Sequence, residues 1–578
     1  MADCALDSRP TPHAPVQMVQ KQTNILRRLP LSLLGKVWPA ENVGLGMRVC
    51  KWMRKDLPSC VEKVALVGPA CNEARVEDIT ASLLQYQNVP LMLRWCPAYS
   101  SCMSLGVLLQ GISNAMAEGF GKAFVHLDLS NSGSDPFWCN SDGFDGTSDG
   151  FCPGRTVLGV LLRCKAPLSL SLGGNRNASH TISEILNGLA AEGTPLAHLN
   201  LSQNEMLGSE TQIKTLIQLL ETSKATISHL NLSDNNLFSD GVDSLAGVLP
   251  KCKALSYLDL GWNSACADSQ HALFAALSNC KSLLHLNLCQ NLIAQEGAHA
   301  LTSVLVHCPL LEHLDLSANA IEDGVGVVAS TLSSSCKSLT HLNLGRNLLG
   351  LQGMQQLSHH LGESPCLTHL DLSMNNICAE AAASLVPILS RCSRLQSLEL
   401  GCNSINAAGA RAMRAGIKAC SSLTRLGVGD NGIGVQGLKE VLFAVSDKAM
   451  VELELSGNQI GSEGAGVVAK ACEKVGKTLQ RLDLSNNGIG KPGAAKLAHG
   501  IVRCSVLTHL ELRGNELGPA GGGVIVEALA ACPSLSLLGL ARTAVGSEGV
   551  SQLATVLARG EAGRLERLWL AGNAMGEE

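Results

Sequence analysis

The side chains in this sequence that could most readily bind a metal or respond to pH are eight of its 16 histidines. Each lies directly before a leucine, in a triplet that ends in Asp, Asn or Glu. Imidazole titrates near neutral pH and is a common metal ligand, so this pattern would have chemical meaning if the triplets lay side by side. The column contains His126, His198, His229, His285, His313, His341, His369 and His509.

The elements that position these histidines are units of 28 residues, with the pattern Leu-x-x-Leu-x-Leu-x-x-Asn. From Asn263 to Asn431 the asparagine recurs in six steps over 168 residues. The asparagine column contains Asn175, Asn204, Asn235, Asn263, Asn291, Asn319, Asn347, Asn375, Asn403, Asn431, Asn458, Asn487, Asn515 and Asn573. Pro69, Cys96, Ser132 and Thr543 take the place of asparagine in weaker units. The register therefore predicts 18 units between Val61 and Asn573.

The second half of each unit has the spacing of an amphipathic helix. After Asn375, for example, apolar residues follow at Leu385, Ile388, Leu389 and Cys392. A glycine recurs six residues after the asparagine, where we expect adjacent helices to pack closely. We expect the asparagine to hydrogen-bond the backbone of the turn, because buried backbone groups need partners. Nine cysteines end the helical stripe as small core residues: Cys164, Cys252, Cys280, Cys308, Cys336, Cys392, Cys420, Cys504 and Cys532.

This pattern resembles the ribonuclease-inhibitor-like subfamily of leucine-rich repeats, which NOD-like receptors also carry. The resemblance implies an α/β leucine-rich-repeat solenoid, a horseshoe with parallel strands on the concave face and helices on the convex face. It also implies that the concave face binds a protein partner. We therefore expect residues 61–578 to form one repeat domain that works in protein recognition.

Because side chains alternate along a strand, the histidines would face the concave surface as a ladder with a spacing of roughly 4.8 Å. Such a row lacks the convergent ligands of a metal site, so we expect no metal. One interpretation is that HLDL and HLNL are common fillings of this motif, which every copied unit inherits. The alternative hypothesis is that the ladder makes partner affinity depend on pH near neutral. From Asn403 onward, Arg425, Glu452, Arg481 and Arg567 take places in the column beside His509, and these charges either steer a partner or form a solvated surface. The candidate protein-binding residues on these strands are Tyr257, Trp262, His285, His313, His341, His369, Arg425, Arg481 and Trp569.

One unit is longer than the others, with 43 residues between Ser132 and Asn175. The excess, at about 133–155, is rich in Gly, Ser and Asp and contains the aromatic residues Phe137, Trp138 and Phe144. Long irregular insertions often carry function. We interpret this one as either a partner-binding loop or a tolerated insertion.

The N-terminal 60 residues lie outside the repeats. Residues 1–24 are polar and are expected to be disordered. Residues 25–60 resemble an F-box, the motif that docks to the Skp1-like adaptor of cullin ubiquitin ligases, although the spacing between Trp38 and Val49 is short. The alternative is a helical cap on the first repeat. Under the F-box interpretation, the residues that contact the adaptor are Leu29, Pro30, Leu33, Leu34, Trp38 and Val49.

Composition narrows the remaining function classes. The net charge is −5, so nucleic acid is not an expected partner. We find no signal peptide and no run of apolar residues long enough to cross a membrane, so we expect a monomer in the cytoplasm or nucleus. No catalytic or cofactor-binding motif is present, so we expect no enzyme and no cofactor. The alternative function is a GTPase regulator, because Ran GTPase-activating proteins have similar repeats.

Overall fold

A computed structural model describes residues 64–68, 91–95, 124–131, 153–163, 168–265, 267–362, 364, 366–529, 531–559 and 564–574. The chain divides into two compact units, Met1–Leu196 and Ala197–Glu578. The predicted tail (1–24), the F-box-like segment (25–60) and nearly all of the insertion lie outside the described residues. Those three predictions remain untested.

The first unit repeats a strand and a helix in its described part. Its strands β1 to β4 pair in parallel in the order of the chain. The elements are β1 (Val64–Gly68), β2 (Leu91–Trp95), β3 (Phe124–Asp128), α7 (Pro153–Leu161), β4 (Leu168–Ser171), η2 (Arg176–Ala178) and α8 (Ser179–Ala191).

The second unit is a parallel sheet in which each strand pairs with the next one along the chain. Its strands are β5 (Leu196–Asn200), β6 (His229–Asn231), β7 (Tyr257–Asp259), β8 (His285–Asn287), β9 (His313–Asp315), β10 (His341–Asn343), β11 (His369–Asp371), β12 (Ser397–Glu399), β13 (Arg425–Gly427), β14 (Glu452–Glu454), β15 (Arg481–Asp483), β16 (His509–Glu511), β17 (Leu537–Gly539) and β18 (Arg567–Trp569). Across both units, the described residues contain one strand for each of the 18 predicted repeats.

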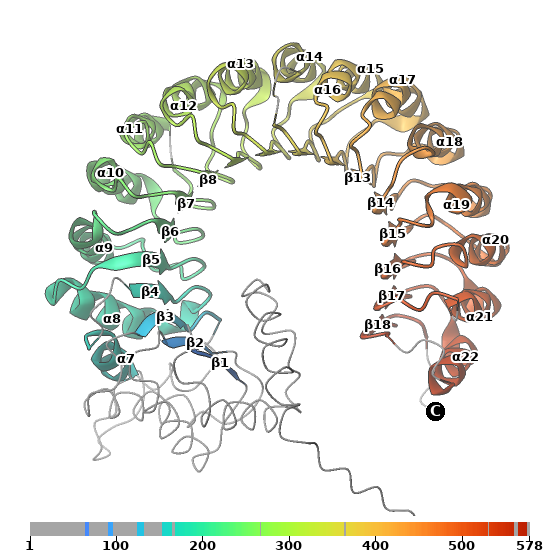
Figure 1. Ribbon diagram of the computed structural model, residues 1–578, viewed down its shortest axis with the longest axis horizontal. Helices are drawn as coiled ribbons and strands as arrows, with labels where there is room; N and C mark the ends of the chain where they lie inside the picture. Colours follow the sequence, from blue (N-terminus) through green and yellow to red (C-terminus); the bar gives the residue numbers. More distant parts are fainter. Residues whose placement is uncertain are drawn as a thin grey trace, which may run out of the picture. The chain divides into compact units, whose positions relative to one another are not determined.

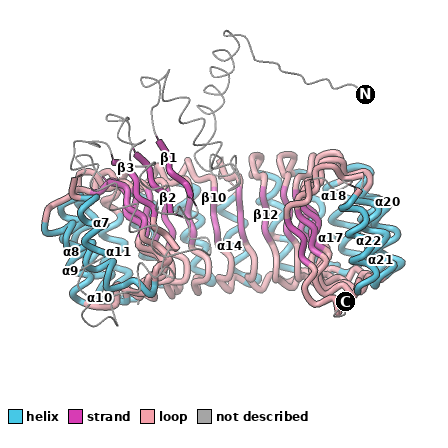
Figure 2. Tube along the Cα trace, turned by 90° about the horizontal axis from the view of Figure 1, so that it is seen from below, coloured by secondary structure: helices cyan, strands magenta, loops and turns pink. Residues whose placement is uncertain are grey.

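Helices alternate with these strands and cover one side of the sheet. They are α9 (Glu210–Ser223), α10 (Phe238–Val248), η3 (Leu249–Lys251), α11 (Ala267–Leu277), α12 (Gln295–His307), η4 (Glu322–Gly324), α13 (Val325–Ser335), α14 (Gly350–Leu361), α15 (Ala379–Ala383), α16 (Leu385–Arg391), α17 (Asn406–Ala419), α18 (Gly434–Val445), α19 (Gly461–Val475), α20 (Lys491–Ile501), α21 (Gly518–Leu529) and α22 (Gly546–Ala558). In Figure 1 the strands of this unit line the inner side of an arc and its helices lie outside. Figure 2 shows the strands running side by side across its width. The repeating strand-and-helix solenoid predicted from the sequence is confirmed.

One predicted helix is divided. The stripe after Asn375 forms α15 and α16, which meet at Ser384. Pro387 follows three residues later and has no N–H to donate to the carbonyl group of residue 383. The helix therefore breaks just before the proline.

The asparagine column is a buried hydrogen-bonded ladder, as predicted. Nδ2 of Asn375 donates to the carbonyl oxygen of Leu344 in the preceding repeat at 2.8 Å. Its Oδ1 accepts from the backbone N–H groups of Asn347 at 2.9 Å and Leu349 at 3.4 Å. Each asparagine thus joins its own turn to the turn before it. Thr543, which has no amide, contacts the carbonyl oxygen of Leu540 at 2.6 Å and Oδ1 of Asn573 at 3.2 Å through its hydroxyl.

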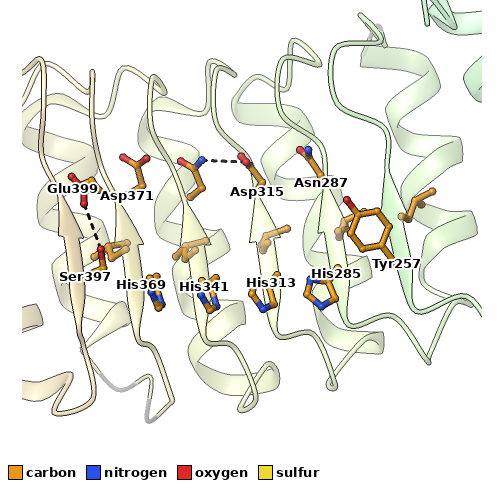
Figure 3. Close-up of a pocket in the computed structure, with 16 residues that line it drawn as sticks. Tyr257, His285, Asn287, His313, Asp315, His341, His369, Asp371, Ser397 and Glu399 are labelled. Carbon is orange, nitrogen blue, oxygen red and sulfur yellow. Dashed lines mark hydrogen bonds between the residues drawn. The ribbon is translucent and has the colours of Figure 1, made fainter. Parts of the chain in front are cut away.

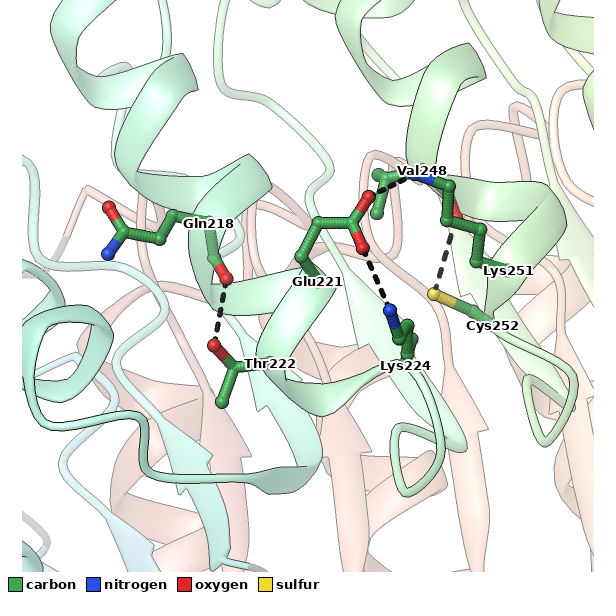
Figure 4. A network of polar contacts seen from close by, with 7 residues as sticks. All are labelled: Gln218, Glu221, Thr222, Lys224, Val248, Lys251 and Cys252. Atoms are coloured by element: carbon green, nitrogen blue, oxygen red, sulfur yellow. Dashed lines mark hydrogen bonds and ion pairs between the residues drawn. The ribbon is translucent and has the colours of Figure 1, made fainter.

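The cysteine column lies in the core at the helix ends. The described members of the predicted set are all buried, whereas Cys164 lies outside the described residues. The thiol of Cys308 donates to the carbonyl oxygen of Leu277 at 3.6 Å, and that of Cys336 donates to Leu305 at 3.2 Å. Figure 4 shows the same position in α10–η3, where the thiol of Cys252 meets the carbonyl oxygen of Val248 at 3.7 Å. These thiols bond carbonyl groups near the ends of the helices, where the intrahelical ladder of hydrogen bonds stops.

The recurrent glycines lie in the first turn of the helices, where adjacent repeats are closest. A Cβ atom at Gly437 would lie 3.1 Å from Cα of Ala407, and one at Gly493 would lie 2.9 Å from Cα of Ser462. Both distances are shorter than ordinary carbon contacts. The expectation of close helix packing at these glycines is therefore confirmed. No helix in the described part of the chain is both long and apolar enough to cross a membrane.

Candidate binding face

A ladder of four stacked imidazoles crosses the inner face of strands β8–β11. Their ring centroids are 4.1, 3.9 and 3.9 Å apart in chain order, and successive rings are tilted by only 20°, 15° and 11°. In-register parallel pairing places the rings one strand spacing apart, which allows them to stack. We call this set, His285, His313, His341 and His369, the histidine ladder (Figure 3).

A tyrosine continues this stack on the side of lower residue number. Tyr257 stacks on His229 with 3.8 Å between ring centroids, and lies 5.7 Å from His285 at a tilt of 37°. The predicted anchor Tyr257 is therefore a half-buried member of the ring stack. His126 belongs to the first unit, where its Nδ1 lies 2.6 Å from Oγ of Ser169.

Threonine hydroxyls orient two of the ladder rings. Oγ1 of Thr340 lies 2.8 Å from Nδ1 of His341 and also donates to the carbonyl oxygen of Glu312 at 3.0 Å. Thr368 and His369 repeat the arrangement. A hydroxyl has one hydrogen, so its bond to the carbonyl group favours an imidazole that donates from Nδ1. Nε2 of each ring is then the hydrogen-bond acceptor.

Stacking and burial also shift the pKa values of histidines in the ladder. The pKa of His341 is lowered to about 4, first by burial and then by the neighbouring rings of His313, His369 and His285, which resist a second positive charge. Burial likewise lowers the pKa of His313 and His369. The lowered pKa values keep the rings of His313, His341 and His369 uncharged at neutral pH, and His341 becomes charged only at acidic pH. The dependence of partner affinity on pH stays a prediction.

A second column of polar side chains runs beside the ladder, where carboxylates and amides alternate. It contains Asn231, Asp259, Asn287, Asp315, Asn343 and Asp371. Nδ2 of Asn343 donates to Oδ2 of Asp315 at 3.1 Å (Figure 3). Each amide separates two carboxylates by two strand spacings, which limits their repulsion.

The alternation ends at β12, where Glu399 is directly beside Asp371. The pKa of Glu399 is raised to about 7, first by burial and then by the negative charges of Asp371, Glu452 and Glu454. Like Glu511, whose pKa is also raised to about 7, Glu399 therefore titrates near neutral pH. Sequence inspection could have found it, because Glu399 breaks the alternation of acid and amide.

The two columns line a groove of about 370 Å³ over β7–β12. Its lining includes neither lysine nor arginine, and its polar side chains are the histidine ladder, Tyr257, Asn287, Asp315, Asn343, Asp371, Ser397 and Glu399. The groove is therefore rich in hydrogen-bond acceptors and negative charge. It is suited to a ligand that carries hydrogen-bond donors and positive charge.

One group among the described residues has donor atoms close enough to consider for a metal. The ligand atoms of His285, Glu312 and His313 lie within 4.8 Å of one another. However, the two imidazoles stack face to face, with only 20° between their planes. Their in-plane lone pairs run side by side, whereas metal ligands must converge on one point. This arrangement favours stacking over coordination.

The face of strands β13–β18 has different chemistry. Arg425 and Arg481 are exposed and lie on either side of Glu452, with N–O distances of 3.8 and 3.7 Å. Glutamates that continue the second column on these strands lie over glycines of neighbouring strands. A Cβ atom at Gly539, for example, would overlap the carboxylate of Glu511. Glycine there makes room for the longer acid, a pairing that the sequence interpretation missed.

The remaining predicted residues divide into two groups. Trp262 and Trp569 are exposed at 55% and 48%, outside the groove lining. Phe137, Trp138 and Phe144 lie outside the described residues. So do the predicted adaptor contacts Leu29, Pro30, Leu33, Leu34, Trp38 and Val49.

Comparisons with known proteins agree with the repeat architecture. A model described as "Leucine Rich repeat" matches residues 223–246, 307–324, 335–358, 363–386, 391–413, 419–442, 450–469, 477–498 and 503–526. A comparison with curated proteins finds no match.

Two solved structures are similar at 18% sequence identity each. One is an internalin (inlF) from Listeria monocytogenes, with a TM-score of 0.38 over 64% of this chain and 84% of that chain. The other is TLR13 in a complex with ssRNA13, with a TM-score of 0.36 over 84% of this chain and 62% of that chain.

Proposed function

The chain is a leucine-rich-repeat protein, and from that premise we propose that it recognises another protein through the groove over β7–β12. The observation that carries the proposal is the groove itself, which is lined by ordered hydrogen-bond acceptors and carboxylates. Stacking and threonine contacts hold the rings in place. A pre-ordered surface loses little conformational entropy on binding.

The test is affinity purification of the full chain with quantitative mass spectrometry. The groove variant carries His341→Ala and His369→Ala, which remove two rings without touching the buried leucines. The control carries His299→Ala and His307→Ala, which remove two exposed rings from α12. We expect at least one partner to be depleted about tenfold or more by the groove variant alone. An identical partner set for both variants would contradict the proposal.

A narrower function rests on residues 25–60, whose resemblance to an F-box supports a substrate receptor of a cullin ubiquitin ligase in the cytoplasm or nucleus. The repeats would then recruit the substrate. Co-purification of a Skp1-like adaptor with the full chain, and its loss in a chain that begins at residue 61, would support this function. Retention of the adaptor by the shortened chain would contradict it.

The alternative of a GTPase regulator rests on the resemblance of the repeats to those of Ran GTPase-activating proteins. The exposed pair Arg425 and Arg481 supplies the cations that such a regulator could direct at a phosphate. Both side chains are already paired with Glu452, which favours a structural role. Stimulation of GTP hydrolysis by Ran that is lost in Arg425→Ala would favour this alternative over the first.

A further inference from the structure

Five large apolar side chains stand out from the turns that follow strands β6–β11. We call this set the turn edge: Phe238, Trp262, Leu292, Leu348 and Met374, exposed at 53%, 55%, 63%, 49% and 47%. They occur in five of six successive turns, which span roughly 24 Å at the strand spacing of a sheet. Trp262 and Met374 directly precede the column asparagine, Leu292 and Leu348 directly follow it, and Phe238 begins α10. Exposed apolar residues that recur in this way mark an interaction surface more often than scattered single residues.

The backbone conformation of these residues is also unusual. All five have positive φ, at 47°, 59°, 57°, 59° and 55° in the same order. Side chains of L-residues crowd the backbone in this left-handed conformation, and bulky ones are rare there. Each residue of the turn edge is therefore unfavourable twice, once for its backbone conformation and once for its exposed apolar surface.

The turns that follow β13–β18 show that the fold does not require such residues. The left-handed positions there include nine glycines: Gly432, Gly434, Gly457, Gly461, Gly488, Gly514, Gly518, Gly546 and Gly572. The other left-handed residues in those turns are polar or alanine. Glycine relieves the strain at the same repeat positions and exposes no side chain. The geometry of the turns therefore does not explain the large side chains of the turn edge.

The turn edge lies next to negative charge. Trp262 follows Asp259 by three residues, and Met374 follows Asp371 by three residues, so each turn adjoins the second column. Figure 3 shows that Asp315, Asp371 and Glu399 lie on the turn side of the central leucines, opposite the histidines. One cation, Arg346, is exposed within the described part of these six turns.

We propose that the turn edge binds a cationic amphipathic segment of a partner protein, with its apolar side chains on the turn edge and its lysines or arginines on the carboxylates of the second column. This inference rests on the proposed function, because it names the partner chemistry and extends the groove to the adjoining turns. Charge complementarity selects the cationic partner, and the length of the strip selects an extended segment.

The left-handed backbone of these turns allows a direct test. A substitution to glycine should relieve the strain of the turn while it removes the apolar contact with the partner. The test variant is Leu292→Gly with Met374→Gly. Its matched control is Gln290→Gly with Asn376→Gly, which changes the left-handed polar residues of the same two turns. We expect neither double variant to lower the Tm of the full chain. A fall in Tm for the test variant alone would assign the two apolar residues a structural role and overturn the proposal.

Binding is measured with three labelled synthetic peptides and the full chain by fluorescence anisotropy. One peptide is a Lys/Leu amphipathic sequence, one has Glu in place of Lys, and one has Ser in place of Leu. We expect the Lys/Leu peptide to bind more tightly than the other two, and the test variant to weaken it at least tenfold while the control stays within twofold. Equal binding of the Glu/Leu peptide, or equal affinity of both variants, would overturn the proposal.

Two further measurements exclude other occupants and separate this inference from the proposed function. Sedimentation that shows a dimer lost only in the test variant would replace the partner with a second copy of this chain. Binding of the chain to anionic vesicles that is lost only in the test variant would replace the partner with a membrane surface. If His341→Ala with His369→Ala depletes partners but the test variant does not, the groove function stands and the turn edge fails.

Discussion

Strands β6–β11 and strands β13–β18 share their buried leucines and asparagines but present different surfaces. The first region has stacked uncharged rings, alternating acids and amides, and large apolar residues in left-handed turns. The second has paired charges and left-handed turns occupied mainly by glycine. The same repeat can therefore be built with or without strain at its edge. We therefore interpret the large apolar residues in the left-handed turns of the first region as a sign of binding. The glycine-containing turns of the second region are the comparison that supports this interpretation.

The largest effect that we predict is common to both regions, because both depend on the asparagine ladder. Asn375→Ala and Asn487→Ala each leave several buried backbone groups without partners. An unpaired buried group costs about 1–3 kcal/mol, so each variant should lose at least about 3 kcal/mol of unfolding free energy. Chemical denaturation measures the loss. A much smaller loss in one region would show that the two do not share one ladder.

The next effect belongs to the boundary between the regions, where Glu399 has its pKa raised to about 7. A carboxyl group with a raised pKa contributes stability below its ordinary value near 4.5, and that contribution is lost as the pH rises through 7. Glu399→Gln should therefore be more stable than wild type at pH 8, on the order of 2 kcal/mol, and equal to it at pH 4. Denaturation midpoints between these values measure the difference. The exposed Glu473→Gln is the control, and an equal gain there would contradict the assignment.

Much of this architecture was predictable because it follows from spacing. The 28-residue period placed one strand in each unit, and the buried asparagines and cysteines followed from their fixed positions. The pKa values of the ladder could not be predicted, because they depend on the distance between rings such as those of His313 and His341. The backbone strain at Leu292 could not be predicted either, because its positive φ angle is known only from the three-dimensional structure. The pairing of Glu511 with Gly539 was readable, but only after strand register linked the two positions.

The histidine ladder predicts a third effect, at acidic pH. The pKa of His341 lies near 4, below its ordinary value of 6.5, so the stability that the neutral ring contributes is lost as the pH falls from 6.5 through 4. His341→Gln should flatten this part of the stability profile, with a smaller effect than Glu399→Gln because water screens a ring that is only partly buried. NMR titration of the ring protons measures the pKa directly. A value near 6.5 would show that the rings do not stack in solution.

The smallest effect tests the charges of the second region. Glu452 lies between Arg425 and Arg481 with both N–O distances above 3.6 Å, and both arginines are about half exposed. Ion pairs of this kind contribute at most about 1 kcal/mol, and salt screens them. Glu452→Gln should therefore lose less than about 1 kcal/mol at low ionic strength and nothing measurable at 1 M salt. A loss that persists in high salt would mean that these charges stabilise the fold by specific hydrogen bonds. The contrast between a pre-ordered face and a solvated one would then not hold.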